Sequence, residues 1–292
     1  MENHKYLPEG RLIHTHENIS SLASTETINR ALEEKQVLEG IALKCGPDLT
    51  LTVDLGGHTG FIAKNEAAIG TDDGATRDIA IISRVGKPVA FQILQADADT
   101  FILSRRQLQE AAKRYFLSTL KLGDVIPVTI THMEPFGAFV DMGCGLTALI
   151  SIENISTARI AHPSDRFATG DETWAVVQNI EEETGRFSLS HKELLGTWAE
   201  NAAAFTQGET VFGIVRSIKP YGAFVELSPN LSGLTEPYPD LKEGDFVSVY
   251  IKAILPEKRK IKLIVISMLD ALPPSPKMHH YITEGNVADW TY

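Results

Sequence analysis

The stretch FGAFVDMG, residues 136–143, decides the fold because it occurs again as YGAFVELS at residues 221–228. The two copies lie 85 residues apart, and Gly123 and Gly208 upstream keep the same offset. A weaker copy, LTVDLGGHTGFIAKNEAA, begins at Leu51. Self-similarity at a fixed period indicates a repeated structural unit. The sequence therefore predicts three units, of which the first is diverged.

Each unit consists of short segments with the pattern of β-strands, bounded by Gly, Asp and Asn turns. In the second unit, VIPVTITHM at residues 125–133 is β-branched and alternates, and four further short apolar segments follow up to residue 191. Five short strands in about 70 residues fit a small closed or partly closed barrel. The segments between the units, SRRQLQEAAKRYFLSTL and HKELLGTWAENAAAF, carry apolar side chains at helical spacing.

These boundaries predict seven regions along the chain. They are an N-terminal extension with a short helix (1–34), a diverged barrel (35–104), a helical linker (105–120), a second barrel (121–191), a second helical linker (192–206), a short third barrel (207–268) and a tail (269–292). The tail enters through PPSP at residues 273–276, which favours a mobile segment or a docking tail.

Composition restricts the class of protein. The 292 residues carry 27 Lys+Arg against 38 Asp+Glu, a net charge of −11, which argues against nucleic-acid binding by bulk positive charge but leaves small local faces open. Cys45 and Cys144 lie far apart without a CxxC motif, which excludes a disulfide framework and favours a reducing compartment. No apolar run approaches the roughly 20 residues of a membrane helix, and the first residues do not look like a signal peptide. A cytoplasmic, monomeric protein is expected.

The second unit resembles the RNA-binding domain of ribosomal protein S1, an OB-fold barrel. The resemblance rests on Gly123-Asp124, on FGAFVDMGCG, on GDE at 170–172 and on TGRFSLS at 184–190. The third unit matches at both ends but has a short connection around 236–242. The resemblance implies an all-β protein of bacterial type, with three tandem five-stranded OB-fold barrels joined by short helices. It also implies binding of single-stranded RNA or mRNA, association with the small ribosomal subunit, and no catalysis.

Single-stranded nucleic acid is held by aromatic side chains that stack on bases beside a basic groove. The second unit offers Phe136 and Phe139. Their spacing in an ideal strand would send the rings to opposite faces, unless Gly137 hosts a bulge that brings both to the outer face. By the resemblance, Ser151 replaces a histidine of the RNA face and Arg186 is its arginine; the alternative for Arg186 is an exposed turn residue paired with a glutamate.

The third unit offers Tyr221 and Phe224, with Gly222 between them. Three lysines complete the expected RNA face, namely Lys219, Lys252 and Lys260. The alternative is that the last hairpin is only a solvent-exposed tip. Glu236 stands at the family's histidine position and would repel phosphate.

The first unit has Leu49 and Thr52 at the aromatic positions and Thr100 at the arginine position. We therefore expect a structural or protein-docking role for it. Charge is uneven as well: residues 117–200 sum to −7 and residues 201–292 to −1, which predicts a steeper salt dependence for the third unit.

The function expected from these features is non-catalytic single-stranded RNA binding in translation. Two alternatives stay open: a protein–protein adaptor with weak RNA binding, and a non-catalytic subunit of an RNA-degrading or transcription assembly. The sequence has no GxxxxGK[ST], GxGxxG, HExxH or GxSxG motif, so we expect no enzyme activity, cofactor or metal. Cys144 in a hairpin turn is either inert or a reactive thiol, and His279-His280 is either a surface pair or an adventitious metal binder.

Overall fold

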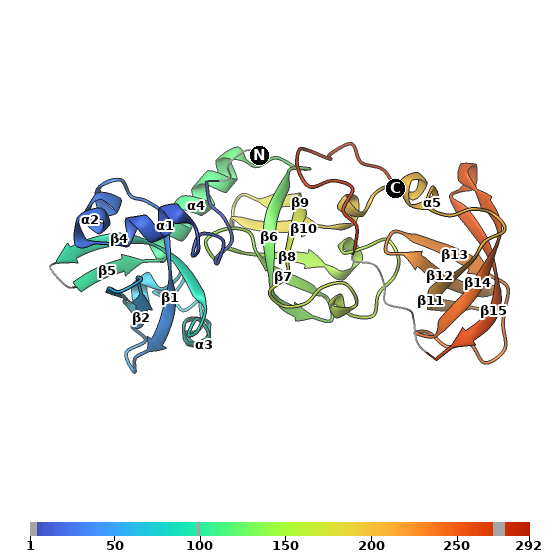
Figure 1. Cartoon of the computed structure of the whole chain (residues 1–292), viewed down its shortest axis with the longest axis horizontal. Coiled ribbons are helices and arrows are strands. Elements are labelled where there is room, and N and C mark those ends of the chain that lie inside the picture. Colours follow the sequence, from blue (N-terminus) through green and yellow to red (C-terminus); the bar gives the residue numbers. More distant parts are fainter. Residues whose placement is uncertain (1–4, 98–99, 271–277) are drawn as a thin grey trace.

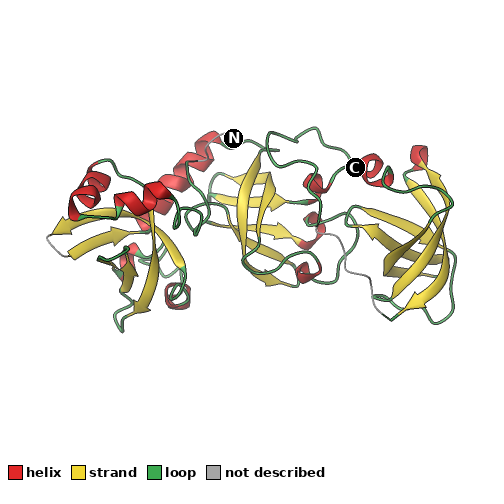
Figure 2. Ribbon diagram, viewed as in Figure 1, coloured by secondary structure: helices red, strands yellow, loops and turns green. Residues whose placement is uncertain are grey.

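The computed structural model describes residues 5–97, 100–270 and 278–292. Three barrels follow one another along the longest axis of the molecule (Figure 1). Each barrel is closed and five-stranded, and the helices are short and lie between or beside the barrels (Figure 2). The prediction of an all-β chain of three tandem five-stranded barrels joined by short helices is confirmed.

The strands have the same connectivity in every barrel. Barrel 1 comprises β1 (Leu38–Cys45), β2 (Leu51–Asp54), β3 (Thr59–Ile62), β4 (Pro88–Asp97) and β5 (Thr100–Ser104). Barrel 2 comprises β6 (Val125–Glu134), β7 (Gly137–Asp141), β8 (Thr147–Ser151), β9 (Glu172–Glu181) and β10 (Arg186–Ser190). Barrel 3 comprises β11 (Thr210–Lys219), β12 (Gly222–Ser228), β13 (Leu231–Thr235), β14 (Phe246–Leu255) and β15 (Lys260–Leu269). The first strand pairs with the second and fourth, and the third runs parallel to the fifth.

The helical elements are short. They are α1 (His16–Ser21), α2 (Thr25–Glu33), η1 (Lys64–Glu66), α3 (Asp78–Ile82), α4 (Arg106–Thr119), η2 (Ile152–Asn154), η3 (Pro163–Asp165), η4 (Lys192–Leu195), α5 (Trp198–Ala202) and η5 (Pro256–Lys258). Helix α4 connects barrels 1 and 2, and η4 with α5 connects barrels 2 and 3. PPSP at 273–276 lies outside the described residues.

Alternation along the strands produces each barrel core. In barrel 2, Val128, Ile130, Val140 and Ile150 are fully buried, and the residues between them face outward. Burying each such aliphatic side chain contributes about 1.5–3 kcal/mol. Because the barrel interior is filled by these side chains, its outer face is the surface left for binding.

Residues just before α1 fasten barrel 1 to barrel 2. The Glu9 carboxylate is buried and accepts hydrogen bonds from the Arg105 guanidinium at 2.6 and 2.9 Å, and the Glu9 N–H donates to Asp141 of barrel 2 at 2.7 Å. The Cys144 N–H donates to the Leu7 carbonyl at 2.8 Å. This joint is therefore hydrogen-bonded on both sides, which makes it stiffer than a solvated linker.

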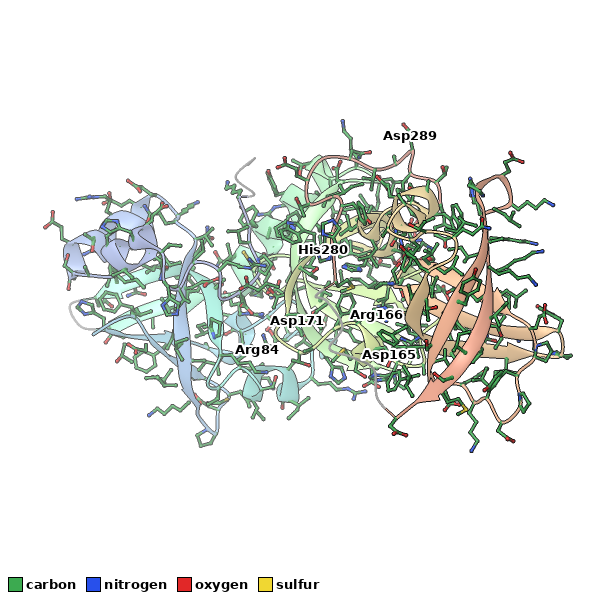
Figure 3. All side chains as sticks on the ribbon, turned by 45° about the vertical axis from the view of Figure 1, so that its right-hand side comes forward. Arg84, Asp165, Arg166, Asp171, His280 and Asp289 are labelled. Carbon is green, nitrogen blue, oxygen red and sulfur yellow. The ribbon has the colours of Figure 1, made fainter. Side chains whose placement is uncertain are left out.

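A second buried charge cluster fastens barrel 2 to barrel 3. Glu226 on β12 pairs with Arg166 at 2.8 Å and with Arg216 at 2.5 Å, and Arg216 also reaches Asp165 at 3.0 Å. Asp165 and Arg166 are labelled in Figure 3. The Asn230 amide adds hydrogen bonds to the carbonyls of Lys192 and Gly196, and its oxygen accepts from the N–H of residue 157.

Residues 278–292 return over barrel 2 and end beside barrel 3 (Figure 1). The N–H of Tyr281 donates to the Leu194 carbonyl at 2.8 Å, and the Val287 N–H donates to Gly123 at 2.8 Å. Ile282 and Val287 pack on a small apolar cluster of barrel 2, which consists of Val125, Val176 and Leu194. The Tyr292 hydroxyl donates to the Asn230 carbonyl at 2.7 Å. We call residues 278–292 the return segment.

Candidate nucleic-acid interface

Phe136 and Phe139 lie on the same outer face of barrel 2. Their ring centroids are 5.9 Å apart in an edge-to-face arrangement. Phe136 lies in the turn before β7 and is 55% exposed, whereas Phe139 is half-buried on the strand. The flanking residues Ala138 and Val140 point into the core. A large aromatic surface therefore faces outward at the β6–β7 end of the barrel.

The expectation of a bulge at Gly137 is wrong. The irregularity in the β6–β7 pairing lies in β6, between Ile130 and His132, while Gly137 pairs regularly with Glu134. Phe136 reaches the outer face because it belongs to the turn and not to the strand. Gly137 has another role: a Cβ there would lie 2.4 Å from the Ile150 carbonyl oxygen, so only glycine allows β7 and β8 to approach.

His132 is an interface residue that the sequence reasoning missed. Its ring stacks on Phe139 with 6.1 Å between centroids and 18° between planes, and its Nε2 lies 2.7 Å from Glu134. Strict alternation from the buried Ile130 would place His132 in the core. The bulge at Thr131 shifts the phase, so Thr131 and His132 are both exposed.

Ser151 and Arg186 lie on the same barrel but have different surroundings. Ser151 ends β8 opposite Gly137, and its hydroxyl accepts a hydrogen bond from the Asn154 amide at 2.9 Å. Arg186 begins β10, is exposed and lies opposite Glu181 in the register. The Glu181 carboxylate instead accepts a hydrogen bond from Thr184 at 2.5 Å.

Barrel 3 places its aromatic pair at corresponding positions. Tyr221 is 62% exposed in the turn before β12, and Phe224 is half-buried on the strand. As in barrel 2, the irregularity lies in the first strand, between Val215 and Ser217, and not at Gly222. Gly222 has φ +147°, and any Cβ there would collide with the Thr235 carbonyl oxygen.

The register defines an outer row of side chains across four strands of each barrel. The row is Lys44, Thr52, Phe61 and Ile102 in barrel 1, His132, Phe139, Leu149 and Ser188 in barrel 2, and Ser217, Phe224, Leu234 and Lys262 in barrel 3, where Ser217, unlike His132, is buried. Lys262 thus shares the row of Phe224, whereas barrel 2 has an uncharged serine there. Alternation in the segment KIKLIV, residues 260–265, is the signal that identifies Lys262 as well as Lys260.

The lysines predicted for barrel 3 are all exposed. Lys219 ends β11 opposite Gly222, and Lys260 begins β15 two residues before Lys262. Lys252 lies 3.8 Å from Glu236, so part of its charge is compensated by the carboxylate that replaces the family's histidine. Because the contact is long and exposed, it contributes little to stability.

Barrel 1 has a different outer face. Leu49 lies in the β1–β2 turn with φ +65°, Thr52 is on β2, and Thr100 begins β5 and is exposed. Phe61 is a half-buried aromatic in the outer row that the sequence reasoning did not identify. Its neighbour in the row is Thr52 and not a second aromatic ring.

Cys144 is a buried turn residue. Burial raises the pKa of its thiol well above the usual value, and the nearby Asp141 and Glu9 act in the same direction. Burial and the raised pKa both favour the inert alternative, because only the thiolate is a strong nucleophile. Burial also raises the pKa of Asp141 to about 7, with Glu9 as the next cause.

The two histidines of the tail motif have separate surroundings. The His280 ring nitrogen Nε2 lies 2.8 Å from Nε2 of His191 and 3.3 Å from the Thr173 hydroxyl. His280 is labelled in Figure 3. Burial lowers the pKa of His191 to about 3, with His280 as the next cause, and burial lowers that of His280 as well. His279 instead contacts the ring of Tyr281 at 4.6 Å.

Residues 119–192, which include all of barrel 2, match the S1 RNA binding domain family. The chain thus contains one domain that matches the S1 RNA binding domain family, at the centre of three tandem barrels.

Its relatives include small ribosomal subunit protein bS1 from several bacteria. The Leuconostoc lactis protein is 32% identical over 232 residues, which cover 73% of this chain and 52% of that protein. The Staphylococcus aureus (strain COL) protein is 27% identical over 286 residues, which cover 92% of this chain and 69% of that protein. Against the Rhizobium meliloti protein the match covers 39% of the relative. The chain thus spans about half, or less, of the length of the Leuconostoc and Rhizobium proteins.

Among the helices of residues 5–97, 100–270 and 278–292, none combines the length and the apolar character that crossing a membrane requires.

Proposed function

We propose that the chain binds single-stranded RNA through the outer faces of barrels 2 and 3, without catalysis, and acts in translation in the cytoplasm. The observation that carries this proposal is the packed set of His132, Phe136 and Phe139 on one outer face. Exposed flat rings offer stacking surfaces to bases, and each stacked base contributes about 1–3 kcal/mol. The names of the relatives, all small ribosomal subunit proteins, support association with mRNA or the small ribosomal subunit.

Anisotropy titration of a labelled, unstructured 20-mer RNA tests the proposal. We expect binding at micromolar concentration or better by the full chain at low salt. Replacing Phe136 and Phe139 together by alanine should weaken binding at least tenfold, and the Tyr221→Ala/Phe224→Ala pair should do the same. Both pairs lie on the outer face, so circular dichroism of each variant should match the unaltered chain. No binding by the unaltered chain at low salt contradicts the proposal.

One observation favours protein docking as a second function. Barrel 3 exposes large apolar side chains on neighbouring strands, which are Phe212, Tyr250, Ile264 and Ile266. Tyr250 pairs directly with Ile264 in the register, so these two at least form a continuous surface. Exposed apolar patches mark interaction sites. If the chain fails to bind RNA, pull-down with the unaltered chain against Phe212→Ser/Ile266→Ser tests this alternative.

A further inference from the structure

The return segment forms one wall of an open pocket near the boundary of barrels 2 and 3. The pocket has a volume of about 570 Å³. Its walls include Ile152 and Ile160 from barrel 2, together with Trp290 and Tyr292 from the return segment. The rings of Trp290 and Tyr292 are 6.3 Å apart and inclined by 39°. Two aromatic rings and two branched aliphatic side chains give this pocket flat, apolar walls.

The pocket also contains polar groups without protein partners. Among the described residues, the indole Nε1–H of Trp290 and the Thr157 hydroxyl are buried and make no hydrogen bond. Both residues line the pocket. A buried donor or acceptor without a partner costs about 1–3 kcal/mol, so a ligand is favoured if the Trp290 and Thr157 side chains turn these atoms toward the pocket. The edge of a nucleobase carries both hydrogen-bond donors and acceptors, so it could pair with an N–H group and a hydroxyl.

The charge around the pocket favours a phosphate-bearing ligand. Lys192 and Arg159 line it, against one carboxylate, that of the exposed Glu153. The Lys192 ammonium donates to the Asn154 amide oxygen at 2.8 Å, which holds it in place. A nucleotide supplies both a flat ring for the apolar walls and a phosphate for these cations.

Hydrogen bonds connect the pocket wall to the turn that carries Phe136 and to the end of β8. The Ile152 N–H, in the pocket wall, donates to the carbonyl of Phe136 at 2.9 Å. A hydrogen-bonded chain also runs from Ser151 through Asn154 to Lys192, with steps of 2.9 and 2.8 Å.

The pocket walls are held in place before a ligand arrives. The Tyr292 hydroxyl donates to the Asn230 carbonyl, and main-chain hydrogen bonds fix the preceding residues to barrel 2. A site formed in advance loses little entropy when it binds.

We propose that this pocket is a nucleotide-binding subsite that takes one base of single-stranded RNA between Trp290 and the wall of barrel 2. The subsite rests on the proposed RNA-binding function and extends it to the boundary of barrel 3.

The test compares variants of the full chain with the labelled 20-mer RNA. Trp290→Ala should weaken binding about tenfold, since it removes the stacking ring. Trp290→Phe keeps a ring but loses the N–H and should cost about threefold, as should Thr157→Val. RNA should quench tryptophan fluorescence in the unaltered chain, and Trp290→Phe should lose most of that quenching.

The matched control is Tyr281→Ala, which removes an aromatic ring from the return segment outside the pocket. If Tyr281→Ala and Trp290→Ala weaken binding equally and quenching does not depend on Trp290, the ring has only a structural role and the subsite is contradicted. If Trp290→Ala binds as well as the unaltered chain while Phe136→Ala/Phe139→Ala does not, the subsite is contradicted but the function stands. Failure of the unaltered chain to bind contradicts both.

Discussion

Barrels 2 and 3 share one strand order, one bulge position and one placement of the aromatic pair, yet their outer faces differ. Barrel 2 adds a third ring, His132, to Phe136 and Phe139 and ends its outer row with Ser188. Barrel 3 has Ser217 in place of that ring and ends its row with Lys262. Between these two barrels, therefore, the positions of the aromatic pair are kept and the charge of the outer row differs. If both faces bind RNA, barrel 2 relies on stacking and barrel 3 on phosphate contacts.

The largest effect that tests this comparison is on salt dependence. Replacing Lys260 and Lys262 by glutamine removes two cations from β15, one of them in the outer row of Phe224, so we expect about tenfold weaker binding at low salt. The slope of log affinity against log salt should fall by about 1.4, because each phosphate contact contributes about 0.7 in single strands. Anisotropy titrations at four salt concentrations measure both.

The control for this experiment is Lys35→Gln/Lys87→Gln, which removes the same charge from exposed positions of barrel 1. This variant should leave the RNA affinity at low salt and the salt slope close to those of the unaltered chain. Equal effects of the two double variants would mean that net charge alone matters. The assignment of stacking to barrel 2 and of phosphate contacts to barrel 3 would then be wrong.

A smaller effect concerns the third ring of barrel 2. His132→Ser gives barrel 2 the residue that barrel 3 has at this position, and we expect about fivefold weaker RNA binding with no change in salt slope. His132→Phe restores a ring and should recover most of the affinity. His16→Ser, at an exposed position of α1, is the control. A fall in slope for His132→Ser would show that the imidazole acts through charge.

The smallest effect is the influence of pH on the return segment. This segment covers barrel 2, and barrel 3 has no such cover among the described residues. Burial holds the pKa of His191 at about 3, below its ordinary value near 6.5, so the folded state requires the neutral ring. The contribution of the neutral His191 ring to the stability of the folded state is complete above pH 6.5 and is lost as pH falls toward 3. The protection factors of the amides at residues 278–287, corrected for the intrinsic pH dependence of exchange, should therefore fall between pH 7.5 and 5, while the strands of barrel 3 keep their protection. His280→Gln should reduce the pH dependence; an unchanged profile would assign it to other groups, such as the buried carboxyls of the first joint.

The repeat of FGAF and YGAF predicts small barrels, because alternation, turn residues and spacing all agree there, and the resemblance to the S1 domain adds the five-stranded OB-fold. The outer face was harder. One extra residue in β6 reverses the phase of alternation, so the sequence could not place His132, while Lys262 was accessible from the alternation of KIKLIV. The cover of barrel 2 by residues 278–292 was beyond sequence reasoning for a different reason. Its attachment uses main-chain groups of Tyr281, Gly285 and Val287, which any residue carries.

The return segment has a consequence for dissection of the molecule. A fragment that ends after Ser190 keeps all five strands of barrel 2, yet it uncovers the apolar surface of Val125 and Val176. It also deprives the Val125 N–H of its acceptor, the Gly285 carbonyl. Such a surface favours self-association. We therefore expect the isolated central domain to self-associate more readily than the intact chain, and RNA affinities measured on it to differ for that reason.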